Sequence, residues 1–181
     1  MTYPDPAIRW LLLAFVLIAA TTDLKSHKLP NWLTVTGLLC GLALNLFLYD
    51  VKGLSSAGYG LGLALLVYFP LFLLRAMAAG DAKMMMAIGS LVGPWNWLGI
   101  FVISILVGAP LALLVSMSRR RLAHTFSNMA GVLRSVFRFQ APFKANPELD
   151  VQSGKGLSLP HGAVVALAVV VFLAMGATQS R

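Results

Sequence analysis

Two of the six acidic side chains occur where an acid is costly, beside long apolar runs. Asp23 follows the run LLLAFVLIAA, and Asp81 precedes a Met-rich apolar stretch. A carboxylate at the centre of a membrane costs roughly 2.5–3.5 kcal/mol, and less near the interface. Two adjacent carboxylates cannot both ionise readily, so they share one proton. The ionised one can take a proton from an attacking water, and the protonated one can donate to the developing oxyanion or leaving amine.

Each acid also has a structural interpretation when it is taken alone. Asp81 could cap the N-terminus of a helix over 84–91. Asp23 could begin the polar segment DLKSHK and pair with Lys25 or Lys28. Residue types and spacing therefore leave a catalytic and a structural role both open. The other four acids lie in polar segments, where solvation explains them: Asp5, Asp50, Glu148 and Asp150.

Apolar helices must position these acids. Hydrophobic residues make up 59% of the 181 residues and charged residues 11%, whereas soluble domains carry about 25% charged residues. This composition excludes a soluble globular enzyme, a disordered tail and a secreted disulfide scaffold. The one cysteine, Cys40, excludes an internal disulfide and a Cys-rich zinc module. We therefore predict an all-α polytopic membrane protein.

Six apolar segments are candidate transmembrane helices. A bilayer core of about 30 Å requires roughly 20 helical residues. The first and fourth segments are shorter than this, and each has an Asp at one end. We predict one transmembrane domain over 1–181. Its six spanning segments are expected over about 8–22, 32–49, 57–74, 77–92, 95–117 and 159–178.

The distribution of basic residues predicts the orientation. Eleven of the fourteen Lys and Arg residues fall in loops on one side, including the run over 119–121, and this side should be cytoplasmic. Both termini are then outside, while Asp23 and Asp81 lie at the cytoplasmic face. The net charge of +8 is therefore an orientation signal and does not indicate a nucleic-acid partner. Trp95 and Trp97 are expected in an aromatic belt at the outer interface.

The loop over 118–158 carries a helical pattern of its own. Apolar residues recur at every third or fourth position after a run of three arginines. This spacing predicts an amphipathic helix, and its basic start favours a location on the cytoplasmic membrane surface. The apolar positions are Leu122, Phe126, Met129, Leu133 and Phe137.

The residues around both acids resemble the active-site motifs of type IV prepilin peptidases. DLKSHKLPNWLT over 23–34 is similar to the first motif, an Asp, a short basic loop and a hydrophobe-Pro-Asn-x-Leu-Thr run. AAGDAK over 78–83 is similar to the second, Gly-x-Gly-Asp-x-Lys, with Ala78 in place of the first Gly. LPHGA over 159–163 resembles the Pro-Tyr-Gly entry to the last helix. The resemblance covers most of 10–115 and the last apolar segment.

The resemblance implies an intramembrane aspartyl protease in which Asp23 and Asp81 are the catalytic pair. A carboxyl pair of this kind needs no metal, cofactor or covalent intermediate. Independently of the resemblance, Pro30 should fix the entry to the second segment, and Asn31 can cap that helix. The supporting residues that match the motifs are Lys25, Lys28, Pro30, Asn31, Gly80 and Lys83.

The resemblance also implies a substrate and a location. Prepilins and pseudopilins carry a short basic leader before an apolar helix, and the enzyme would cut at the cytoplasmic face of the bacterial inner membrane for the pilus assembly machinery. Larger members of the family add a methyltransferase domain with paired cysteines. The single Cys and the lack of an insertion between the first two segments predict the small peptidase-only branch, such as the enzymes of tight-adherence (Flp-type) pili.

Two other function classes remain open on the residues alone. In a small proton-coupled transporter or channel, Asp23 and Asp81 would be relay sites. Such proteins often show paired broken segments in two halves, and we find no such halves in the sequence. A non-enzymatic scaffold would use its basic loop to bind anionic lipid or a partner ATPase. It would tolerate Asn at both Asp positions.

Overall fold

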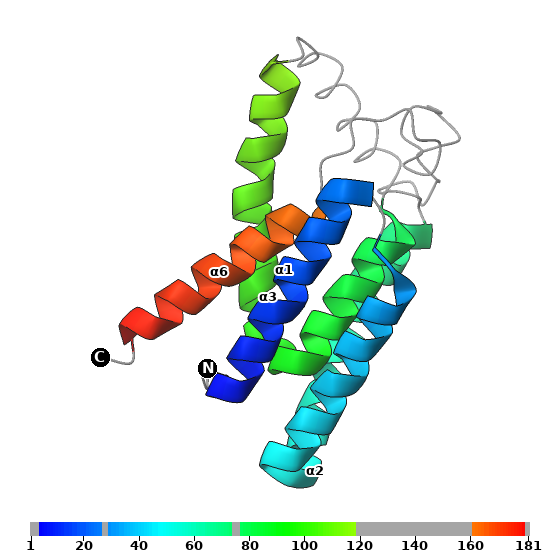
Figure 1. The fold of residues 1–181 in the computed structure, drawn as a ribbon, viewed down its shortest axis with the longest axis vertical. Helices are drawn as coiled ribbons and strands as arrows, with labels where there is room; N and C mark the ends of the chain where they lie inside the picture. Colours follow the sequence, from blue (N-terminus) through cyan, green and yellow to red (C-terminus); the bar gives the residue numbers. More distant parts are fainter. Residues whose placement is uncertain (1–3, 27–28, 74–76, 119–160, 180–181) are drawn as a thin grey trace.

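The described part of the chain consists of helices. The computed structural model describes residues 4–26, 29–73, 77–118 and 161–179. Its elements are α1 (Pro6–Ser26), α2 (Asn31–Leu73), α3 (Ala79–Ser118) and α6 (His161–Gln179), shown in Figure 1. The all-α prediction is confirmed for these residues.

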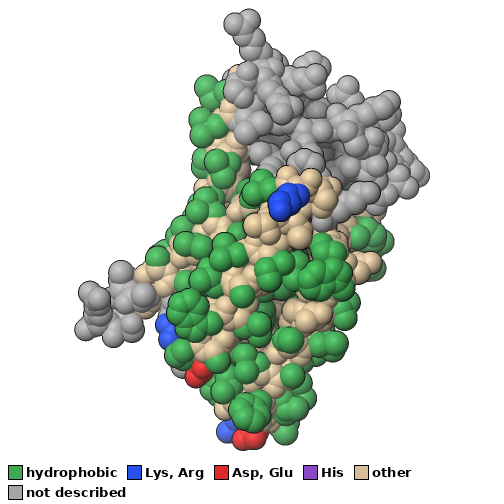
Figure 2. Space-filling view, viewed as in Figure 1, with side chains coloured by type: hydrophobic (Ala, Val, Ile, Leu, Met, Phe, Trp, Pro, Cys, Tyr) green, Lys and Arg blue, Asp and Glu red, His purple; other side chains and the backbone are tan. Residues whose placement is uncertain are grey.

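Among the described residues, three helices are long and apolar enough to cross a membrane, namely α1, α2 and α3 over Ala79–Leu114. The fourth, α6, has a shorter apolar stretch over His161–Gly176. Figure 2 shows a largely hydrophobic surface along the helices in that view, with charged side chains near the helix ends. These features support a membrane protein. The number of spanning segments stays a prediction. The predicted amphipathic helix, from Leu122 to Phe137, lies outside the described residues.

A single residue with non-helical backbone interrupts each of the two longest helices. Asp50 has φ 55° and ψ −147° in α2, and Gly93 has φ 75° and ψ 176° in α3. Glycine adopts positive φ without steric cost, and Asp does so more readily than most other residues. Pro94 follows Gly93 directly and cannot donate the backbone hydrogen bond that would continue the first half of α3. Both interruptions fall between segments that the sequence analysis separates.

The chain reverses direction at both interruptions. Figure 1 shows the two halves of α2 running in opposite directions from a turn at the lower end of the molecule. Gly41 in the first half and Gly60 in the second half both lie against the first half of α3, near Leu91 and Gly89 respectively. The start of α2 and the start of α3 therefore lie at one end of the molecule, and the turn at Asp50 lies at the other.

The core is built around the first half of α3. Met84 and Met85 are fully buried there. Trp97 is buried as well, donates from Nε1 to the Met85 carbonyl oxygen at 3.0 Å, and stacks on Phe101 with ring centroids 5.2 Å apart. The prediction of an interfacial Trp97 is therefore wrong. The chain reverses at Gly93, and Trp97, which follows this reversal, packs back onto the first half of α3. Trp95 is 66% exposed, as an interfacial residue would be.

Small residues allow α2 and α3 to approach closely. A Cβ atom added to Gly60 would meet the carbonyl oxygen of Gly89, and one added to Gly89 would meet the carbonyl oxygen of Gly60. Close backbone contact of this kind is a common way for helices to associate in membranes, where apolar burial gives little driving force. The contact sets the position of the N-terminal turn of α3, which carries Asp81.

Candidate functional site

Four helix ends meet at the end of the molecule opposite the Asp50 turn. They are the C-terminal end of α1, which carries Asp23, and the N-terminal ends of α2, α3 and α6. Asp81 is in the first turn of α3, and its carboxyl group lies within electrostatic range of Asp23 and His161. The fold therefore brings together the two acids that the sequence analysis selected.

The Asp23 carboxylate is held by the N-terminus of α6. Asp23 is 7% exposed, and its Oδ2 accepts a hydrogen bond from the backbone nitrogen of Gly162 at 2.8 Å. The first backbone amides of a helix have no partner within the helix, and the helix dipole favours a negative charge beside them. Lys25, which the structural interpretation paired with Asp23, is exposed, and Lys28 lies outside the described residues.

Asp81 is fixed by the first turn of its own helix. The Ala82 nitrogen donates to the Ala78 carbonyl oxygen at 3.4 Å, so the helix begins just after Ala78. The backbone amide of Ala78 in turn hydrogen-bonds to the Asp81 carboxyl group, as the acidic residue of a capping box does. The structural alternative, Asp81 as the N-cap of a helix over 84–91, is wrong because α3 already begins at Ala79.

The second predicted motif contacts the first through Lys83. Lys83 Nζ donates to Asn31 Oδ1 at 2.9 Å and so ties α3 to the start of α2. The prediction that Asn31 caps α2 is wrong. The carbonyl oxygen of Pro30 accepts hydrogen bonds from the nitrogens of Leu33 and Thr34 at 3.1 and 3.4 Å, which places Pro30 at the cap and Asn31 at the first helical position.

Gly80 allows the segment before α2 to lie against the first turn of α3. A Cβ atom on Gly80 would lie 3.2 Å from Leu29 Cβ, which is tighter than an ordinary van der Waals contact. The small residue next to Asp81 therefore places the Leu29–Pro30 entry of α2 beside the candidate acid. The backbone that approaches the first turn of α3 at Gly80 is therefore the one leading into α2.

Sequence reasoning did not identify two groups of this site, the Gly162 amide and the His161 ring. A Cβ atom on Gly162 would lie 3.0 Å from Asp23 Oδ2. His161 Nε2 is buried and has no hydrogen-bond partner within the described residues, and such a group calls for an explanation. The only feature of the sequence that pointed to these two groups was the segment LPHGA over 159–163, which resembles a family motif. The segment does not indicate that α6 packs against α1.

The arrangement can perform acid–base chemistry. Two carboxyl groups come from different helices. One accepts a hydrogen bond from a backbone amide of α6, and the other lies within electrostatic range of His161, whose Nε2 atom is buried. Two carboxyl groups within electrostatic range of each other can divide the acid and base roles, so that one activates a water while the other donates a proton to the product.

The comparison with protein families gives one match. Residues 10–113, more than half of the chain, match the profile of a family described as the type IV leader peptidase family. The matched range contains Asp23, Asp81 and all of the supporting residues. No curated protein and no solved structure matches the chain.

Proposed function

The chain belongs to the type IV leader peptidase family, and on this basis we propose that it is an intramembrane aspartyl endopeptidase acting on type IV prepilin-like substrates. It removes a short basic leader next to an apolar helix. The observation that carries the proposal is the meeting of Asp23 and Asp81 at one end of the helices, with Asp23 Oδ2 held by the Gly162 amide at 2.8 Å.

The proposed membrane arrangement has six spanning segments. The reversals at Asp50 and Gly93 divide α2 and α3 into two segments each, and α1 and α6 supply the other two. The positive-inside rule places the Asp23–Asp81 end at the cytoplasmic face of the inner membrane and both termini outside. In this orientation the basic leader stays in the cytoplasm, the apolar helix enters the bilayer, and the bond between them lies at the level of the acids.

The proposed mechanism assigns different roles to the two acids. Asp23 is given the role of the base, because the hydrogen bond from the Gly162 amide to its Oδ2 holds this carboxyl group in one orientation. It takes a proton from a water whose oxygen attacks the scissile carbonyl carbon. Asp81 donates its proton as the C–N bond breaks, and the nitrogen leaves as the new N-terminal amine of the mature subunit. The leader keeps the water oxygen in its new carboxyl group.

A leader-cleavage assay tests the proposal. The full-length chain is reconstituted in liposomes with a prepilin-like substrate that has a basic leader and an apolar helix, and the products are analysed by mass spectrometry. We expect one cut, at or near the junction of leader and helix. An inserted, folded chain that leaves a panel of such substrates intact, or that cuts unrelated unfolded proteins equally well, would contradict the proposed activity.

Metal chelators are expected to leave the rate of leader cleavage unchanged. The proposed carboxyl pair activates water directly, so no step depends on a bound ion. The measurement compares initial rates before and after incubation with phenanthroline. Inhibition that added zinc reverses would show that the water is activated by a metal, and the carboxyl-pair mechanism would then be wrong.

Gly162→Ala is expected to lower the cleavage rate at saturating substrate about tenfold. A 1 Å displacement of a catalytic group can lower the rate about 100-fold, and the Asp23 carboxylate has to move by less than this. The added methyl group would lie 3.0 Å from Asp23 Oδ2, so the carboxylate has to move by a few tenths of an ångström. Gly58→Ala is the matched control, since its Cβ atom would meet nothing within 4 Å. Equal rates for the two variants would show that the Gly162 contact does not position Asp23.

A further inference from the structure

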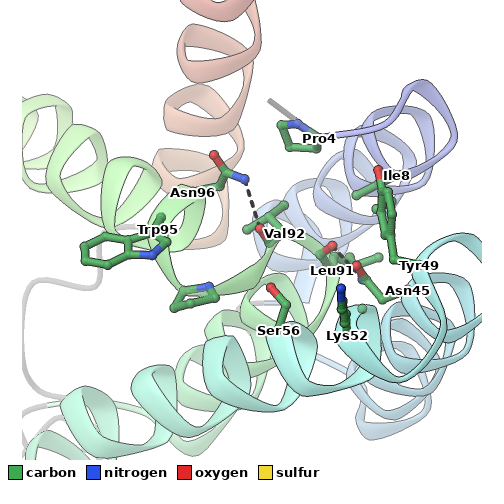
Figure 3. A pocket seen from close by; sticks show the side chains of 12 residues that line it. Pro4, Ile8, Asn45, Tyr49, Lys52, Ser56, Leu91, Val92, Trp95 and Asn96 are labelled. Carbon is green, nitrogen blue, oxygen red and sulfur yellow. Dashed lines mark hydrogen bonds between the residues drawn. The ribbon is translucent and has the colours of Figure 1, made fainter. Parts of the chain in front are cut away.

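A pocket of about 390 Å³ lies at the end of the molecule opposite the acids. It is formed where the start of α1 meets the reversals of α2 and α3, and Figure 3 shows its lining. The volume is in the range of about 300–1,000 Å³ that is typical of ligand sites. None of its lining residues belongs to the candidate peptidase site. Its lining includes Asn45, Tyr49, Lys52 and Trp95.

Lys52 gives the pocket a positive charge. Its side chain is among those that line the pocket, and no acidic side chain is found in the lining within the described residues. On the orientation proposed above, Lys52 is one of only three basic residues at the outer side. Basic residues are depleted from that side of membrane proteins, so the positive-inside rule does not account for a lysine at position 52. Its ammonium group is suited to bind an anion such as a phosphate.

Asn45 adds a hydrogen-bond acceptor in a fixed orientation. The side chain is 6% exposed, and its Nδ2 lies 3.0, 3.1 and 3.0 Å from the carbonyl oxygens of Gly41, Ser90 and Leu91. The two hydrogens of Nδ2 are shared among these three acceptors. Because all three partners are carbonyl oxygens, the Asn45 side-chain atom beside them must be the nitrogen, and the other must be Oδ1. These contacts leave Oδ1 with no hydrogen-bond donor within the described residues. The pocket therefore offers a cation at Lys52 and an acceptor at Asn45.

The pocket lies at the level expected for lipid headgroups. Tyr49 and Trp95 line it and are 46% and 66% exposed, and aromatic residues of this kind concentrate at the membrane–water interface. The large side chains Phe47 and Val51, which flank Tyr49 in sequence, are also strongly exposed. An occupant of this pocket can therefore place a polar group inside and an apolar chain along the outside of α2.

We propose that this pocket binds the headgroup of a membrane phospholipid. The phosphate contacts Lys52 Nζ, and an N–H or O–H group of the headgroup donates to Asn45 Oδ1. Ethanolamine and glycerol headgroups have such donors, and choline has none. The proposal requires insertion of the chain in a bilayer. It does not depend on peptidase activity.

Native mass spectrometry of the full-length protein in detergent tests the proposal, with phosphatidylethanolamine as the titrated lipid. Lys52→Ala is expected to weaken the binding of one lipid about tenfold, which corresponds to about 1.4 kcal/mol. Lys52→Arg keeps the charge and should bind within about threefold of the parent, a difference of well under 1 kcal/mol. Lys25→Ala removes an exposed lysine at the other end of the molecule and should bind like the parent.

Three results would overturn the proposal. The first is a Lys52→Ala protein of unchanged melting temperature that binds phosphatidylethanolamine like the parent. The second is equally tight binding of phosphatidylcholine, because its headgroup cannot donate to Asn45. The third is displacement of the lipid by an equal concentration of inorganic phosphate, which would identify the pocket as a site for free anions. Weak phosphatidylcholine binding and failure of phosphate to compete support a headgroup site.

Discussion

Replacement of either Asp23 or Asp81 by Asn is expected to reduce leader cleavage by about 10³-fold or more, because each residue supplies an acid–base function worth roughly 10²–10⁴-fold and neither can replace the other. Asn has nearly the shape of Asp but cannot take up or release a proton at neutral pH. The Gly162 amide can still donate to an Asn oxygen at position 23, so the contact between α1 and α6 that holds this side chain is retained while the chemistry is lost.

The measurement is the initial cleavage rate of each variant in liposomes, normalised to inserted protein. Asp50→Asn is the matched control, because Asp50 is an exposed acid at the opposite end of the molecule and Asn also tolerates its positive φ. The double variant should be no slower than the slower single variant, since residues that act as a unit are not additive. A single Asn variant that keeps a tenth or more of the parent rate would rule out a two-carboxyl mechanism.

Gly60→Ala is expected to lower the free energy of unfolding by about 1–3 kcal/mol, the usual effect of forcing an extra carbon into a packed interface. The new Cβ atom would meet the carbonyl oxygen and carbon of Gly89 and the backbone of Gly93. Backbone atoms cannot rotate away as a side chain can, so α2 and the first half of α3 have to separate.

Two glycines of the same helix provide the controls. Cβ atoms on Gly58 and Gly62 would meet nothing within 4 Å, so alanine at either position should raise stability by up to about 1 kcal/mol through its better helix propensity. Reversible unfolding in mixed micelles, followed by circular dichroism, measures all three variants. A Gly60→Ala protein as stable as the Gly58→Ala protein would show that α2 and α3 do not need this close approach.

The apolar pattern was sufficient to predict where helical segments occur. The expected boundaries between segments bracket the interruptions at Asp50 and Gly93, because these positions combine polar or turn-forming residues with gaps in the apolar runs. The apolar pattern could not predict in which direction a side chain points when its residue follows such a turn. Trp97 faces the core because of the angle at which the chain leaves Gly93, and a sequence pattern carries no information on that angle.

The acids of the candidate site were predictable and their surroundings were not. Asp23 and Asp81 stand out because acids beside apolar runs are costly and because both lie in segments that resemble family motifs. The roles of Asn31 and Gly162 depend on contacts between helices that are distant in the chain. Asn31 accepts from Lys83, and Gly162 donates to Asp23. The local rules for helix capping describe only the helix in which a residue stands and could not predict these partners.

The hydrogen bond between Gly162 and Asp23 links the first described helix that the ribosome produces to the last one. A nascent chain acquires both acids early, and the amide that orients Asp23 follows only with α6. Asp23 can therefore take up the orientation described here only after α6 has been made and has packed against α1. A chain released before α6 is made would hold both carboxyl groups without the hydrogen bond that orients Asp23.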